Sequence, residues 1–235
     1  MSIKLIAEFL GTMILILLGD GVVAGVVLNK SKSQNAGWMV IASGWAMAVM
    51  LPAFIFGAIS GAHFNPALTI ALAVIGKFPW TQVPGYVIAQ LLGAMAGATL
   101  VWLAYLEQWK VTDDKAGKLA VFCTGPAIRK YSSNFITEVI GTFVLVFVIL
   151  GIGNVKAADG IPTFVVGGLI LGLGLSLGGP TGYAINPARD LGPRIAHALL
   201  PISGKGDSDW AYSWVPVIAP IVGAVLAALL WVAVF

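Results

Sequence analysis

The sequence predicts an all-α membrane protein with six transmembrane helices and two re-entrant half-helices. Three observations lead to this fold class: the composition, the long apolar runs, and two short segments that begin with Asn-Pro-Ala. Hydrophobic residues make up 59% of the 235 positions and charged residues only 10%, whereas about a quarter of an average soluble domain is charged. A soluble fold could not cover so much apolar surface, which excludes a soluble domain, a disordered chain and a disulfide-stapled secreted module.

Apolar runs long enough to cross a bilayer, which takes about 20 residues of helix, occur six times. Charged and polar residues separate these runs and mark the segments that face water. The polar stretch 107–130 is expected to be an outer loop. The expected spans lie at about 4–28, within 33–76, and at about 83–106, 133–153, 161–179 and 211–235.

Two further segments begin a helix but are too short to cross. Each places an asparagine, a good N-cap, directly before a proline at the first helical position. The helices that follow end near residues 75 and 197, and ten residues of helix rise about 15 Å, half of a bilayer core. They are therefore predicted to be re-entrant half-helices, preceded by backbone that lines a watery cavity or is buried by protein. The two boxes are Asn65, Pro66 and Ala67, and Asn186, Pro187 and Ala188.

The motifs occur twice, which predicts two repeats at 1–130 and 131–235. Glu8 lies in Ala-Glu-Phe-Leu-Gly-Thr and Glu138 in Thr-Glu-Val-Ile-Gly-Thr, 130 residues later, and the second box follows the first by 121 residues. Each repeat would hold three spans and one half-helix. Because three is odd, the second repeat enters the membrane from the opposite side, and such inverted repeats place the working site at the midplane.

The N-termini of the half-helices are expected to meet there. Each carries partial positive charge and unpaired N–H groups, so the meeting point repels cations, including hydronium. Asn65 and Asn186 are expected to cap their own half-helices and to direct amide donors into a pore, where they orient a passing oxygen. The residues before the boxes are expected to be extended and to offer their carbonyls as acceptors: Gly61, Ala62 and His63, and Gly182, Tyr183 and Ala184.

Several other functions find no support in the residues. The single Cys123 cannot form an internal disulfide, and a net charge of +3 is far from the basic surface that nucleic acids require. His63, His197 and one cysteine make no convincing transition-metal site. No cofactor is expected, and Ser176 with His63 forms no nucleophile motif of an intramembrane hydrolase.

The paired boxes, with Ser60-Gly-Ala-His-Phe before the first and Arg189-Asp190 after the second, resemble the major intrinsic proteins, the aquaporins and glycerol facilitators. The resemblance covers the chain from Glu8 to the last span. It implies a passive channel rather than an enzyme, a homotetramer with one pore per subunit, and cytoplasmic termini in the plasma membrane. With cytoplasmic termini, ten of the thirteen basic residues would lie outside or in the outer half-helix. The positive-inside rule therefore favours the opposite orientation; we follow the resemblance.

The resemblance also implies that Glu8 and Glu138 brace the loops before the half-helices. An ionisable group at this depth is costly and usually functional, so a proton relay is the alternative. In that case the chain would be a proton-coupled secondary transporter using both carboxylates.

Finally, the resemblance implies a selectivity filter made of Trp45, Gly174, Tyr183 and Arg189. Glycerol facilitators carry Trp, Gly, Phe and Arg, whereas strict water channels carry His at the glycine position; Asp190 also resembles the glycerol branch. Arg189 offers up to five N–H donors, Trp45 and Tyr183 offer flat apolar walls, and Gly174 is expected to widen the pore. The expected solutes are glycerol and water, with undissociated lactic acid, dihydroxyacetone and urea left open, as is the effect of tyrosine in place of phenylalanine.

Overall fold

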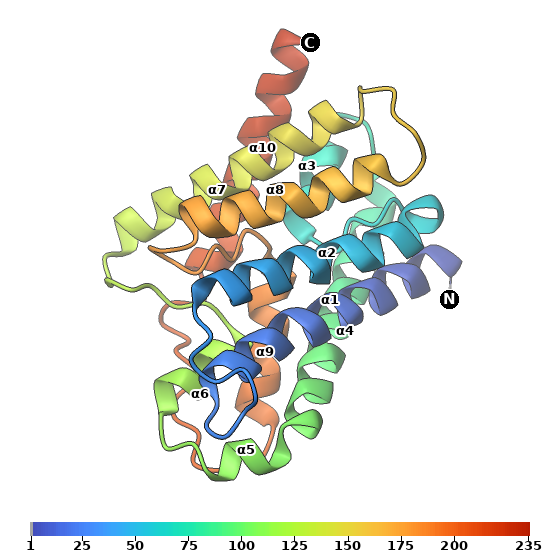
Figure 1. Cartoon of the computed structure of the whole chain (residues 1–235). Coiled ribbons are helices and arrows are strands. Elements are labelled where there is room, and N and C mark those ends of the chain that lie inside the picture. Colours follow the sequence, from blue (N-terminus) through green and yellow to red (C-terminus); the bar gives the residue numbers. More distant parts are fainter. Residues whose placement is uncertain (1) are drawn as a thin grey trace.

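The structure, a computed structural model, describes residues 2–235, and every regular element in this range is helical (Figure 1). The elements are, in chain order, α1 (Ile3–Val27), α2 (Trp38–Ser60), α3 (Pro66–Val74), η1 (Trp80–Gln82), α4 (Val83–Ala104), α5 (Leu106–Lys110), α6 (Lys115–Phe122), α7 (Tyr131–Ile152), α8 (Ile161–Leu177), α9 (Pro187–Leu199) and α10 (Val215–Val234).

The long helices confirm the predicted spans. Within residues 2–235, five helices are long and apolar enough to cross a membrane, namely α1, α2, α4 with the preceding η1, α7 and α10. The sixth span, α8, has 17 residues, which corresponds to a rise of about 26 Å, close to the thickness of a hydrocarbon core. The boundaries lie within a few residues of the apolar runs, because lipid-facing helices end where charged or turn-forming residues begin.

The two short helices confirm the predicted half-helices. The first, α3, has 9 residues and the second, α9, has 13, so they rise about 14 and 20 Å and neither can span the core. In both, the proline of the box stands at the first helical position. Each half-helix packs on a long helix of the other half of the chain: α3 against α10, and α9 against α4.

Helix pairs of the two halves match one another. The contact of α1 with α4 corresponds to that of α7 with α10, and the contact of α1 with α2 corresponds to that of α7 with α8. Glycine permits the closest approaches: a Cβ at Gly93 would lie 2.3 Å from the carbonyl oxygen of Phe9, and one at Gly223 would lie 2.3 Å from that of Val139. By contrast, a Cβ at Gly168 or Gly172 would meet open space; the Gly-x-x-x-Gly spacing there does not pack spans within the chain.

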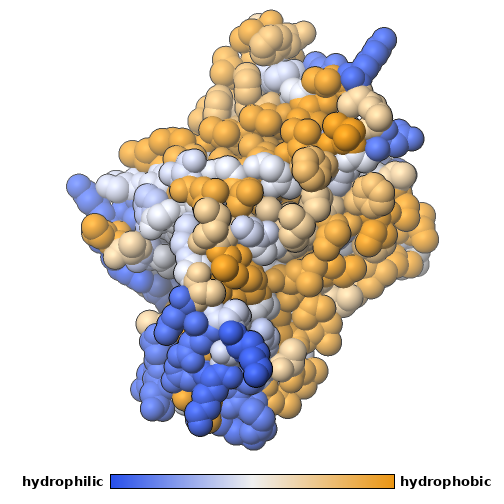
Figure 2. Space-filling model, viewed as in Figure 1, coloured by the Kyte–Doolittle hydropathy of each residue, from blue (hydrophilic) through white to orange (hydrophobic). Residues whose placement is uncertain are grey.

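The stretch 107–130 is not a plain loop, because it holds α6 and most of α5. Asp114 caps α6 by accepting a 3.0 Å hydrogen bond from the backbone N–H of Gly117, and α6 packs against α1 and α9. Figure 2 shows hydrophilic residues gathered at this end of the molecule, whereas hydrophobic residues cover the long helices. Both chain ends lie away from α5 and α6 (Figure 1).

Candidate functional site

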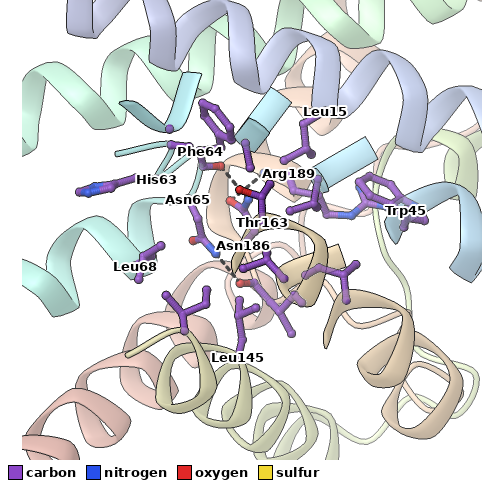
Figure 3. A pocket seen from close by; sticks show the side chains of 18 of the residues that line it. Leu15, Trp45, His63, Phe64, Asn65, Leu68, Leu145, Thr163, Asn186 and Arg189 are labelled. Carbon is purple, nitrogen blue, oxygen red and sulfur yellow. Dashed lines mark hydrogen bonds between the residues drawn. The ribbon is translucent and has the colours of Figure 1, made fainter. Parts of the chain in front are cut away.

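A cavity of about 270 Å³ lies between the two half-helices and the spans around them. Leucine side chains from α1, α3 and α7 (Leu15, Leu68 and Leu145) form part of its apolar wall, and Asn65 and Asn186 lie next to each other inside it (Figure 3). All six residues expected to supply carbonyls also lie along its wall. The wall of the cavity is therefore mostly apolar, and the polar groups form a narrow stripe along it.

The two asparagines cap their half-helices and also tie the two loops together. Asn65 Oδ1 accepts from the backbone N–H of Ala67 at 2.9 Å, and Asn186 Oδ1 accepts from that of Ala188 at 3.0 Å. Asn65 Nδ2 donates to the carbonyl of Ile185 at 2.8 Å. Asn186 Nδ2 reciprocates at 2.8 Å to the carbonyl of Phe64 (Figure 3). Since an amide –NH₂ has two donors, each asparagine keeps one N–H for a solute.

The loops before the half-helices are not extended as predicted. Left-handed φ values occur at matched positions in both loops, and their range at non-glycine residues is 41° to 49°. Such a conformation costs about 1–3 kcal/mol per residue and persists only where the surroundings impose it. It lets two successive backbone N–H groups in each loop point toward the same buried carboxylate. The residues concerned are Gly61, Ala62 and Phe64 in the first loop, and Gly182, Tyr183 and Ile185 in the second.

Glu8 imposes this geometry on the first loop. Its Oε1 accepts from the backbone N–H of His63 at 3.0 Å and from Ser60 Oγ at 2.6 Å. Its Oε2 accepts from the backbone N–H of Phe64 at 2.8 Å and from Gln90 Nε2 at 2.8 Å. Both carboxylate oxygens are thus occupied by donors, and the side chain is fully buried.

Glu138 does the same for the second loop. Its Oε1 accepts from Thr181 Oγ1 at 2.7 Å and from the backbone N–H of Ala184 at 3.0 Å, while its Oε2 accepts from the backbone N–H of Ile185 at 2.9 Å. The two carboxylates hold equivalent positions of the two loops. Hydrogen bonds to a buried carboxylate are among the strongest in proteins, so each loop is firmly held.

The guanidinium of Arg189 lies over an aromatic ring beside the cavity. Its Cζ is 4.0 Å from the ring centroid of Trp45, within the range of a cation–π interaction. Arg189 Nη1 donates to the carbonyl of Phe122 at 3.2 Å, and it lies 3.5 Å from Asp20 Oδ1. Trp45 and Arg189 appear together on one side of the asparagines in Figure 3.

Tyr183 occupies the space that the missing side chain of Gly174 leaves free. A Cβ at Gly174 would lie 2.9 Å from both Cζ and Oη of Tyr183. Trp38 holds this pair in place, because its Nε1 donates to the Gly174 carbonyl at 2.8 Å and its ring meets that of Tyr183 edge-on at 5.9 Å. Gly174 thus makes room for a tyrosine, and the tyrosine, not the glycine, meets the cavity.

Asp190 fastens the outer loop to the start of α9. Its Oδ2 accepts from both the backbone N–H and Oγ1 of Thr124 at 2.8 Å, and its Oδ1 accepts from Arg194 Nε at 2.9 Å. Arg194 in turn donates to the carbonyl of Ser208 at 2.8 Å. These bonds also fix the position of the Phe122 carbonyl, which accepts from Arg189 and lies two residues before Thr124.

His63 lies on the wall of the cavity but is committed to packing. Its Nδ1 lies 3.0 Å from Thr69 Oγ1, and its ring meets those of Phe78 and Tyr86 at 4.8 and 5.1 Å. Thr69 Oγ1 also donates to the Asn65 carbonyl at 3.0 Å. His63 therefore supports the first box from the side.

Sequence reasoning missed two residues of this site, Asp20 and Trp38. Asp20 was detectable, because it is the one acidic residue besides Glu8 in the first apolar run, and an ionisable group in a span is a functional signal. Trp38 carried no such signal, since a tryptophan at the start of a span reads as an interfacial anchor.

Comparisons with known proteins agree on one family. The profile described as Major intrinsic protein matches residues 1–231. The "Probable glycerol uptake facilitator protein" of Thermotoga maritima is 64% identical over 231 residues, which cover 98% of each chain. The "D/L-lactic acid transporter" of Lactiplantibacillus plantarum is 41% identical and covers 96% of this chain and 94% of its own. The X-ray structure of the aquaglyceroporin from Plasmodium falciparum superposes with a TM-score of 0.85 at 33% identity, covering 98% of this chain and 95% of its own. The chain belongs to the major intrinsic protein family.

Proposed function

We propose that this protein is a passive membrane channel that conducts glycerol, and with it water and other small uncharged solutes. The observation that carries the proposal is the cavity itself, in which a guanidinium on a tryptophan ring and a tyrosine face two capping asparagines. The name of the 64% identical relative, a probable glycerol uptake facilitator, supports glycerol. The 41% identical lactic acid transporter supports undissociated lactic acid as a further solute.

A polyol suits the proposed filter of Trp45, Gly174, Tyr183 and Arg189. Within residues 2–235, the bonds of the Arg189 guanidinium involve Nη1 alone, so Nε and Nη2 remain to donate to neighbouring hydroxyls of a solute. The rings of Trp45 and Tyr183 supply an apolar surface for the carbon backbone. Glycerol has one polar and one apolar edge, which matches this division.

Proton and cation exclusion would come from the centre of the cavity. Two helix N-termini, each with partial positive charge, flank Asn65 and Asn186. The free amide N–H of each asparagine would donate to the oxygen of a passing water molecule. The hydrogens of that water would then point away from the two asparagines. A chain of waters broken in this way cannot relay protons.

In the part of the chain that the structure describes, residues 2–235, no contact of Glu8 or Glu138 favours the proton-coupled alternative. Glu8 and Glu138 accept backbone N–H groups on both carboxylate oxygens, and neither lines the cavity. Protonating either one would break the loop that it holds. Bracing is therefore the role that their contacts support.

Three further features belong to the same proposal. The repeats at 1–130 and 131–235 are supported by the matched pairs of helices and of glutamates. A homotetramer with one pore per subunit would cover the open face of α8 at Gly168 and Gly172. Cytoplasmic termini would place α5 and α6 outside.

Stopped-flow light scattering on proteoliposomes tests the function. Vesicles that contain the protein should equilibrate glycerol and water much faster than empty vesicles, with low activation energy and weak saturation. A panel with urea, dihydroxyacetone and lactic acid at several pH values ranks the solutes. Uphill accumulation of solute driven by a pH gradient, or glycerol flux no faster than in empty vesicles, would reject the channel.

A further inference from the structure

An acidic side chain lies directly behind the arginine of the proposed filter. Asp20 is on α1, is fully buried, and places Oδ1 3.5 Å from Arg189 Nη1. Its second oxygen, Oδ2, is buried without a hydrogen-bond partner within residues 2–235. The neighbouring Gly19 lies so close to Trp45 that a Cβ there would be 2.3 Å from the ring. This segment of α1 therefore forms the back wall of the filter.

Among residues 2–235, no other acidic group that borders the site is free to balance the charge of Arg189. Asp190 is the nearest acidic neighbour in sequence, but it binds Arg194 at 2.9 Å from Nε and at 3.2 Å from Nη2. Glu8 and Glu138 are committed to the loops. The charged side chains around the filter are thus two pairs, Arg189 with Asp20 and Arg194 with Asp190, whose charges sum to zero.

We propose that Asp20 is a specificity-determining residue that makes the filter electrically neutral, so that the pore rejects small anions as well as cations. This inference rests on the proposed channel function. A lone guanidinium in a narrow, poorly screened passage attracts anions, and rings of Arg or Lys are the device by which pores select them. Asp20 cancels that attraction and leaves the N–H donors of Arg189 in place for uncharged hydroxyl groups.

The pair also predicts how the filter fails. Removing Asp20 leaves an uncompensated cation, which invites anions. Removing Arg189 leaves an uncompensated carboxylate, which invites cations. Removing both restores neutrality, although the donors to the solute are lost.

The test compares Asp20→Asn, Arg189→Val and the double variant in proteoliposomes. Nitrate and potassium permeabilities are measured as diffusion potentials with a voltage-sensitive dye, and glycerol flux by light scattering of the same vesicles. In Asp20→Asn, the ratio of nitrate permeability to glycerol flux should rise at least about tenfold over the wild type, which corresponds to about 1.4 kcal/mol. In Arg189→Val potassium permeability should rise, and in the double variant it should fall back by about tenfold.

Thr99→Val serves as the control, because it too removes a polar group from a span. Within residues 2–235 the half-buried Thr99 hydroxyl bonds to Met95 of its own helix alone, at 2.8 Å. This variant should leave both ion permeabilities at wild-type values. If nitrate exclusion in Asp20→Asn equals that of the wild type, the inference is overturned. Should that variant not fold, equal potassium leaks in Arg189→Val and in the double variant overturn it instead. Glycerol flux in the wild type fails or succeeds independently of these ion measurements, so the two proposals are judged separately.

Discussion

Asn186 donates a 2.8 Å hydrogen bond to the backbone carbonyl of Phe64, a residue 122 positions earlier in the chain. The reciprocal bond runs from Asn65 to Ile185. Each half-helix is therefore capped by an asparagine that also holds the loop of the other half. These two side chains join the two loops at the middle of the fold, and the shape of the cavity depends on both.

The first prediction follows from this exchange. Asn186→Ala removes an N-cap, worth about 0.5–2 kcal/mol, and a bond between the loops, worth about 0.5–1.5 kcal/mol. Thermal unfolding in detergent should show a clear loss of stability, and glycerol flux should fall because the first loop loses the bond from Asn186 that ties it to the second. Asn154→Ala, an exposed position between α7 and α8, is the control. An Asn186→Ala protein as stable as that control would show that the cross-loop bond contributes nothing.

The second prediction concerns the brace of the second loop. Glu138→Gln replaces one acceptor oxygen with an amide that would face backbone N–H donors of Ala184 or Ile185. An unsatisfied buried donor costs about 1–3 kcal/mol, so the melting temperature and the glycerol flux should both fall. The matched control is Glu107→Gln, which loses only an exposed ion pair with Lys110, worth about 0–1 kcal/mol. If the two variants have the same melting temperature, Glu138 does not brace the loop.

The third prediction tests the filter. A side chain at Gly174 would collide with Tyr183 at 2.9 Å, so Gly174→His must be combined with Tyr183→Cys to remain folded. The double variant places an imidazole where the ring was and should reduce glycerol flux far more than water flux, because the larger solute loses its apolar wall. Both fluxes are measured by light scattering on the same vesicles, and water provides the internal control. If the double variant lowers glycerol flux and water flux by the same factor, Gly174 and Tyr183 are not part of the filter.

The spans and half-helices were predictable because local signals specify them. Asparagine is a good N-cap and proline suits the first helical position, and ten apolar residues of helix are too short to cross a bilayer. The braces were predictable in kind, because a glutamate in a span needs partners. The left-handed residues of the loops were not predictable, since Ala62, Phe64 and Ile185 do not favour that conformation, and only the bonds to Glu8 and Glu138 impose it.

Long-range partners account for what the sequence could not reveal. Asp20 lies 169 positions from Arg189, and Trp38 lies 136 positions from Gly174, so neither pairing has a local pattern. The occupant of the space beside Gly174 was not predictable for the same reason, because Tyr183 is brought there by a separate loop. The open face of α8 at Gly168 and Gly172 was not predictable either, because the spacing of glycines does not say which face of a helix meets a neighbour.

The fourth prediction concerns orientation. Several basic residues that argue against cytoplasmic termini are committed to the folded end of the molecule: Lys118 binds the carbonyl of Ser203, and Lys205 binds that of His197 at 2.6 Å. We therefore expect an epitope tag at either terminus to be accessible only after cells are permeabilised. A tag inserted after Asp113, beside α6, should be accessible on intact cells. The reverse pattern would make the positive-inside rule correct for this chain.

The last prediction concerns Trp38, which positions the filter without lining the cavity. Trp38→Phe keeps an aromatic ring against Tyr183 but removes the N–H that donates to the Gly174 carbonyl at 2.8 Å. Losing one such bond costs about 0.5–1.5 kcal/mol, and the carbonyl that loses its partner belongs to a buried residue of α8. We expect α8 and Tyr183 to become less well fixed, so that the ratio of urea to glycerol flux rises while total water flux changes little. Trp80→Phe, an exposed tryptophan in η1, provides the control for loss of an indole. A solute ratio equal to that of the control would show that Tyr183 holds its place without Trp38, whereas a changed ratio at unchanged thermal stability would assign Trp38 to selectivity rather than to folding.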